Sequence, residues 1–212
     1  MKKLIAIFLL VSVYPAQASS NGEILDKPGS FHLKIDNIGL HQSHAPCKPH
    51  EIAYDAADTH ARILLECSID SEKDTIRFTF SSDRKDIVRI VRNQYLKTGD
   101  PEPVDVIRTA VKFYGKPNQI DQANLLANYG NAYAVSYSSR FPIITRNAGG
   151  VGLLIKSYPC GDGSFGIEDC KGKGIRFVRY DLIDAAALIK AEKDGENKSI
   201  RRIQDKLKMQ KF

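Results

Sequence analysis

Three histidines and one cysteine recur at every third residue of one short segment, and these residue types could hold a metal ion. They are His41, His44, Cys47 and His50. Imidazole nitrogens and thiolate sulfurs are good ligands for zinc and copper. The pattern therefore predicts a zinc or copper site at His41, His44 and His50. The alternative is a polar loop in which the histidines are simply solvated.

The chain contains four cysteines, an even number that favours disulfide bonds in an oxidising compartment. Three pairings are possible. Near neighbours close the smallest loops, so we expect Cys47 to pair with Cys67 and Cys160 to pair with Cys170. A Cys47 that belongs to a disulfide cannot bind a metal as a thiolate.

Motifs typical of enzymes are incomplete. Residues 161–166 match the letters of the phosphate-binding motif G-x-G-x-x-G, but the following residues do not start the helix that this motif requires. We interpret the segment as the turns of a disulfide-closed loop. The chain has no G-x-S-x-G, H-E-x-x-H or C-x-x-C motif. The carboxylates of Glu66, Asp181 and Asp184 could converge in a hydrolytic site, although their spacing does not single them out.

The first 18 residues have the pattern of a secretory signal peptide. Lys2 and Lys3 precede an apolar run from Leu4 to Val13, and Ala-Gln-Ala at 16–18 is a cleavage pattern. The apolar run is too short to span a bilayer, and no later stretch is long enough for a transmembrane helix. We expect an exported bacterial protein, periplasmic or secreted, whose mature chain begins near Ser19.

Alternating apolar residues predict an antiparallel sheet made of a strand meander and a later hairpin. Strands are expected at 31–35, 63–69, 76–80, 87–91, 133–137, 151–158 and 175–182. The strand at 76–80 has one apolar and one polar face, whereas the run at 87–91 is apolar on both faces, which is typical of a central strand. The hairpin of the last two strands carries the loop between Cys160 and Cys170 at its tip.

Two helices are expected in the middle of the chain. Asp100 can cap the first, Pro101 suits its first turn, and it ends near Gly115. Its apolar residues share one face; they are Val104, Ile107, Val111 and Tyr114. A short helix is also expected at 120–127. The expected fold class is α+β, an antiparallel sheet stapled by disulfides with a helix packed on one face.

The C-terminal region from Asp184 onward has helical composition, with an expected break at Asp194-Gly195. Ile200, Ile203 and Leu207 form a narrow apolar stripe among lysines and arginines. We divide the chain into a signal peptide (1–18), a single exported domain (19–192) and a basic helical tail (193–212). The tail predicts a weak contact with an anionic surface. The alternative is a helix that covers a sheet edge.

The formal net charge is +6, and two of the lysines belong to the signal peptide. This excess is mild, and nucleic acid is a poor partner in the expected compartment. Our leading hypothesis is a non-enzymatic binding or accessory protein, without a cofactor, for an unknown periplasmic or envelope partner. The alternatives are a metal-binding protein that uses the His41–His50 segment and an envelope hydrolase that uses carboxylates.

Overall fold

The computed structural model describes residues 33–54, 61–71, 74–95, 103–139, 141–159 and 175–209. Four predictions fall outside these residues. They are the signal peptide at 1–18, the helix start at Asp100 and Pro101, the pairing of Cys160 with Cys170, and the turns at 161–166.

Within the described residues, eight strands form one antiparallel sheet with the order β1-β2-β3-β4-β10-β9-β6-β5. The first four follow one another as a meander, and β9 and β10 form a hairpin, so the predicted α+β fold class is confirmed. The strands are β1 (His50–Tyr54), β2 (Arg62–Asp70), β3 (Asp74–Phe80), β4 (Ile87–Tyr95), β5 (Gln119–Asp121), β6 (Leu126–Gly130), β9 (Val151–Pro159) and β10 (Ile175–Asp184).

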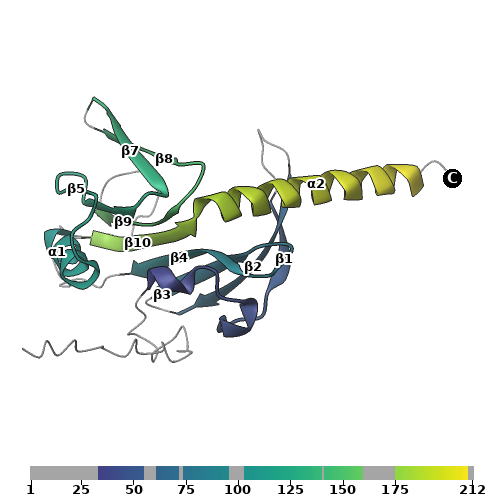
Figure 1. The fold of residues 1–212 in the computed structure, drawn as a ribbon, viewed down its shortest axis with the longest axis horizontal. Coiled ribbons are helices and arrows are strands. Elements are labelled where there is room, and N and C mark those ends of the chain that lie inside the picture. The colour runs from purple at the N-terminus through teal and green to yellow at the C-terminus, as the bar shows by residue number, and fades with distance from the viewer. Residues whose placement is uncertain are drawn as a thin grey trace, which may run out of the picture.

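A second, two-stranded sheet stands away from the first. It consists of β7 (Tyr133–Ser138) and β8 (Phe141–Arg146), which form an antiparallel hairpin (Figure 1). The base of this hairpin is attached to the C-terminal helix α2 (Ala185–Met209), because Arg146 donates two hydrogen bonds of 3.0 Å to the carboxylate of Glu192. Its outer part carries Phe141, which is 75% exposed.

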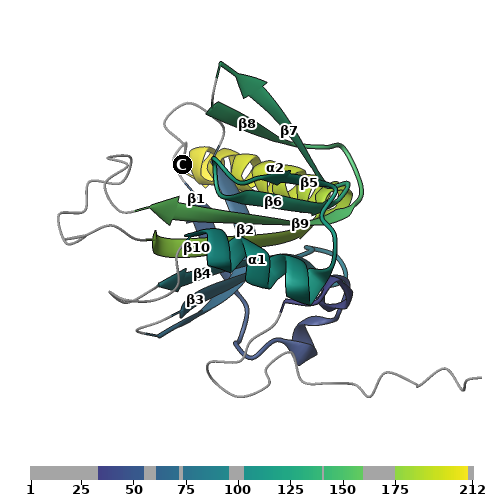
Figure 2. The same cartoon turned by 90° about the vertical axis from the view of Figure 1, so that its left-hand side faces the viewer.

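Each face of the large sheet is covered by one helix. Figure 2 shows α1 (Pro103–Tyr114) in front of the sheet and α2 (Ala185–Met209) behind it. The alternation of side chains follows this arrangement: Leu153 and Ile155 belong to the buried cluster beneath α1, and Leu154 belongs to the cluster beneath α2. A strand between two covered faces needs apolar residues on both sides.

The central position of β4 explains its composition. Ile87 and Ile90 lie in the cluster on the α1 side, and Val88 lies in the cluster on the α2 side. The neighbouring strand β3 was expected to have one polar, solvent-exposed face. Thr79 on that face is instead buried, because it faces the α2 side and its hydroxyl donates a hydrogen bond of 2.7 Å to Glu66.

Two of the predicted elements differ in the structure, and a side-chain hydrogen bond to the backbone accounts for each. Of the strand expected at 31–35, the described residues 33–35 form no strand; a 3₁₀ turn spans Ile35–Asn37, and Asn37 accepts a hydrogen bond of 2.8 Å from the Lys34 N–H. In place of the helix expected at 120–127, β5 and β6 form a hairpin. There Asp121 accepts hydrogen bonds from the backbone and side chain of Asn124, which favours a turn over a helix.

Helix α2 follows β10 directly and runs unbroken for 25 residues, so the expected break at Asp194-Gly195 was wrong. Asp184 caps its start by accepting a hydrogen bond of 3.0 Å from the Ala187 N–H. Gly195 is required by packing rather than by flexibility, because a Cβ at this position would lie 2.3 Å from the backbone oxygen of Ile63 in β2. The predicted boundary between residues 192 and 193 falls inside this helix.

We expect the substitution Gly195→Ala to destabilise the protein by about 1–3 kcal/mol, although alanine is the better helix former. The added methyl group would meet the Ile63 carbonyl of β2, so α2 would have to move away from the sheet. Urea unfolding followed by circular dichroism measures the effect. Asn197→Ala, at an exposed position of the same helix, is the matched control and should be neutral or slightly stabilising. Equal stability of both variants would contradict the close packing.

Candidate functional site

The segment that contains the predicted metal ligands lies along the edge of the α1 face. His41 forms an isolated bridge with Asp86, His44 ends a 3₁₀ turn, and His50 begins β1. All three side chains are exposed, and the Nδ1 atom of His41 lies 2.9 Å from the hydroxyl of Ser43. Among the described residues, no group of three or more His, Cys, Asp or Glu side chains is placed to hold a metal ion. The zinc or copper site at these histidines stays a prediction.

The predicted disulfide between Cys47 and Cys67 is confirmed, with an S–S distance of 2.04 Å. Cys67 is buried on β2, and the bond fastens the segment before β1 to the cluster on the α1 side. Backbone hydrogen bonds reinforce the attachment, because Gly39 donates to Ile87 and Ile87 donates to Leu40, both at 2.8 Å. Cys47 is therefore not a thiolate ligand in this structure.

The three carboxylates named as hydrolytic candidates have separate surroundings. Glu66 is buried on β2 and accepts hydrogen bonds from Tyr54 and Thr79. Asp181 lies on β10, which is separated from β2 by β3 and β4 in the sheet order, and pairs with Arg89. Asp184 caps α2. Each of these groups has structural partners, and the hydrolase alternative stays a prediction.

Asp181 and Arg89 form a largely buried ion pair on the α2 side of the sheet. Both guanidinium contacts are short, 2.9 Å from Nε and 2.6 Å from Nη2, and Arg179 adds a contact of 3.3 Å. Burial by itself would raise the pKa of Asp181, but the hydrogen bond and charge of Arg89 outweigh burial and hold this pKa below its usual value. The pair therefore contributes stability while the carboxyl group is ionised.

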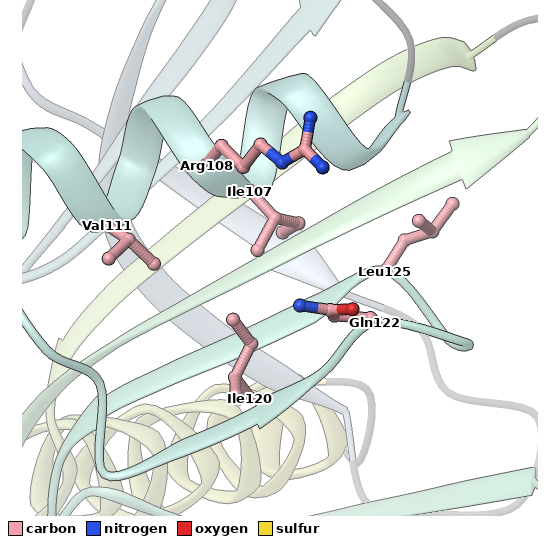
Figure 3. A pocket seen from close by; sticks show the side chains of 6 residues that line it. All are labelled: Ile107, Arg108, Val111, Ile120, Gln122 and Leu125. Carbon is pink, nitrogen blue, oxygen red and sulfur yellow. The ribbon is translucent and has the colours of Figure 1, made fainter.

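A pocket opens between α1 and the β5–β6 hairpin, on the face opposite α2. It has a volume of about 210 Å³. Figure 3 shows aliphatic side chains on both walls, with the Arg108 guanidinium on the helix side and the Gln122 amide on the hairpin side. Its lining residues are Ile107, Arg108, Val111, Ile120, Gln122 and Leu125. An apolar cavity with a few polar groups is the usual form of a small-molecule site.

The hairpin wall of the pocket is shaped by the turn between β5 and β6. The Asp121–Asn124 hydrogen bonds close this turn, and Leu125 then adopts a left-handed backbone conformation with φ of 52°. A branched residue rarely occupies this region, and such strain is commonly kept at functional positions. Ile120 on the same wall is 44% exposed, so the pocket leaves apolar surface open to solvent.

The polar groups at the pocket are available for a ligand. Arg108 pairs with Asp105 at 3.2 Å, but the two side chains are 74% and 48% exposed. Exposed ion pairs of this kind contribute little stability, so a ligand anion could replace Asp105. Ser157 does not line the pocket, but its backbone N–H donates to the carbonyl of the lining residue Leu125 and supports the hairpin wall.

The basic tail extends beyond the sheet. In Figure 1, α2 continues past β1 and β2 toward the C-terminus, and residues 200–209 are all exposed. Lys198 and Arg202 both bind the carboxylate of Glu51 on β1, the latter at 2.6 Å, and their hydrogen bonds lower the pKa of Glu51. The exposed stripe of Ile200, Ile203 and Leu207 is present as predicted.

Within the described residues, fold and site together define an antiparallel α+β protein with an apolar pocket beside α1 and a projecting basic helix end. Comparison with known protein families, curated proteins and solved structures yields no match. No helix among the described residues is long and apolar enough to cross a membrane. The functional argument therefore depends on the pocket and on the helix end.

Proposed function

We propose that this chain is an exported, non-enzymatic binding or accessory protein, periplasmic or secreted, that takes a small ligand in the pocket between α1 and the β5–β6 hairpin. The observation that carries the proposal is the apolar cavity with polar groups on opposite walls. The Cys47–Cys67 disulfide supports export, because such bonds persist in oxidising compartments.

The size and chemistry of the pocket favour one ligand class. An apolar cavity of about 150 Å³ binds benzene, so the volume of about 210 Å³ suits one aromatic ring or a short acyl chain. Arg108 on the helix wall favours a carboxylate or another anion on that ligand, because guanidinium groups bind such anions through charge-assisted hydrogen bonds. The ligand class is thus a small apolar acid.

Two fluorinated probes test this function by ¹⁹F NMR titration of the mature chain. We expect saturable binding of 4-fluorophenylacetate, which is anionic, and weaker binding of the neutral 4-fluorotoluene. Arg108→Gln should weaken binding of the anion about tenfold and leave binding of the neutral probe unchanged, because the lost interaction is a hydrogen bond to a charged group. Ile120→Gln should weaken binding of both probes.

Ile143→Gln on β8 is the matched control, because Ile143 is 46% exposed and Ile120 is 44% exposed. This control should bind both probes like the wild type. Non-saturable shifts in the wild type would contradict the pocket function, and so would equal binding by the Ile120→Gln and Ile143→Gln variants. Circular dichroism of each variant establishes that the fold is retained.

A weak contact between the basic tail and an anionic envelope surface completes the proposed function. The lysines and arginines near the end of α2 support it, since each basic group near an anionic surface adds a favourable contribution of about 1 kcal/mol. This contact would keep the binding protein near the cell envelope, where small apolar acids partition.

A further inference from the structure

We infer that the end of α2 is an in-plane anchor whose apolar stripe, Ile200, Ile203 and Leu207, enters the acyl boundary of an anionic phospholipid bilayer. This inference rests on the proposed surface contact and deepens it, because it names a bilayer rather than an anionic polymer as the surface. It concerns a different part of the molecule from the pocket.

The stripe is exposed on a part of the helix that leaves the protein. Ser199 is the last buried residue of α2, and the ten helical residues after it extend about 15 Å. Ile200, Ile203 and Leu207 are 39%, 52% and 55% exposed. An apolar stripe on a helix of a globular protein normally packs against the core, and the described residues place no core against this one.

The rotation of α2 keeps the stripe from turning toward the sheet. Gly195 and Ser199 are buried and mark the sheet-facing side of the helix. At about 100° per residue, the stripe lies roughly a quarter turn from that side. Lys198 and Arg202 both pair with Glu51 of β1, which agrees with this rotation.

Basic side chains flank the stripe on both sides. The helical spacing places Lys206 on one side and Arg201 and Lys208 on the other, and all three are exposed. Lys208 has a contact of 3.9 Å with Asp205, whose side chain is 71% exposed. Long basic side chains beside an apolar stripe can reach phosphate groups while their stems lie along the acyl boundary.

The charge distribution around the stripe favours one of three occupants. If a second copy of this chain packed against the stripe, the basic side chains of the two copies would face one another, and this repulsion is unfavourable. An anionic bilayer offers opposite charge and an apolar phase together. An anionic polymer offers charge alone, so it would leave the stripe in water.

Vesicle sedimentation of the chain from Ser19 onward tests the inference. We expect binding to phosphatidylcholine vesicles that contain one quarter phosphatidylglycerol, and little binding to pure phosphatidylcholine. The charge variant Arg201→Gln/Lys206→Gln should bind about 10- to 30-fold more weakly. The stripe variant Ile200→Gln/Ile203→Gln/Leu207→Gln should also lose at least tenfold, whereas Ile143→Gln should bind like the wild type.

A fluorescence reporter measures insertion directly. The chain has no tryptophan, so Leu207→Trp provides a single probe on the stripe. Its emission should shift to the blue with anionic vesicles and stay unchanged with dextran sulfate, a soluble anionic polymer. Wild-type binding to vesicles by the stripe variant, with salt sensitivity retained, would overturn the insertion but leave the proposed surface contact intact.

Two further outcomes would also overturn the inference. If neither anionic vesicles nor dextran sulfate bind the wild type at low salt, the insertion and the surface contact both fail. A stripe-dependent dimer in sedimentation velocity without lipid would assign the stripe to a second copy. The pocket titration is independent of these results, because its lining residues lie beside α1.

Discussion

Asp181→Asn is expected to lower the free energy of unfolding at pH 7 by about 3 kcal/mol, since removing one partner of a buried ion pair leaves an uncompensated charge. The side chains of Arg89 and Asp181 are 27% and 9% exposed, so the bidentate contact at 2.6 and 2.9 Å is largely but not fully shielded from solvent. In the variant, the Arg89 charge would stay on the α2 side of the sheet without its carboxylate. Urea unfolding of both proteins measures the difference.

The same pair predicts how stability depends on pH. The pKa of Asp181 is lowered in the folded protein, so its contribution is fully present above the unfolded pKa of about 3.9. That contribution is lost as the pH falls from this value through the lowered folded pKa. The wild type should therefore lose stability more steeply than Asp181→Asn over this acidic range, and the difference between them should shrink.

A double replacement separates the ion pair from general packing. In Arg89→Leu/Asp181→Leu both charges are removed, and such replacements of buried pairs are often neutral or stabilising. We expect this variant to be more stable than Asp181→Asn. Asp83→Asn, which removes an exposed partner of Lys190, should leave the unfolding midpoint unchanged. If the double variant were less stable than the single one, packing rather than charge compensation would explain the loss.

The sheet could be predicted from the sequence where apolar periodicity and chain order agree. Residues 63–69, 76–80 and 87–91 follow one another with short polar turns, so neighbouring strands had to pair. The buried polar residues on the α2 side could not be predicted in this way. Thr79 looks like a solvent-facing residue until α2, more than a hundred positions later in the chain, covers the other face of the sheet.

The pocket could not be predicted from the sequence because its hairpin wall was predicted to be a helix. Asp121 and Asn124 carry the relevant signal, since short polar side chains compete with helical hydrogen bonds and favour turns. Even with the correct hairpin, pairing of β6 with β9 depends on a contact far along the chain. The apolar stripe of the basic tail, in contrast, is a local helical pattern and was predicted.

Loss of the Cys47–Cys67 disulfide should cost about 3 kcal/mol of stability, as expected for a bond that closes a loop of 20 residues. The effect should exceed that of most surface changes, because the bond lies where Ala45 and Cys47 pack against the buried cluster under α1. Cys47→Ala/Cys67→Ala is the informative variant. Alanine is chosen over serine because a serine hydroxyl would be left unpaired beside the core. Urea unfolding compares it with the oxidised wild type.

The second cysteine pair must be kept out of this measurement, so the comparison is made in a Cys160→Ala/Cys170→Ala background. In that background, dithiothreitol should lower the unfolding midpoint of the chain that retains Cys47 and Cys67 and leave the fully substituted chain unchanged. Hydrogen exchange should locate the loss, with faster exchange in the segment at 41–54 than in β4, because the bond fastens that segment to β2. A midpoint insensitive to the reductant would mean that the backbone hydrogen bonds between this segment and Ile87 suffice to hold it.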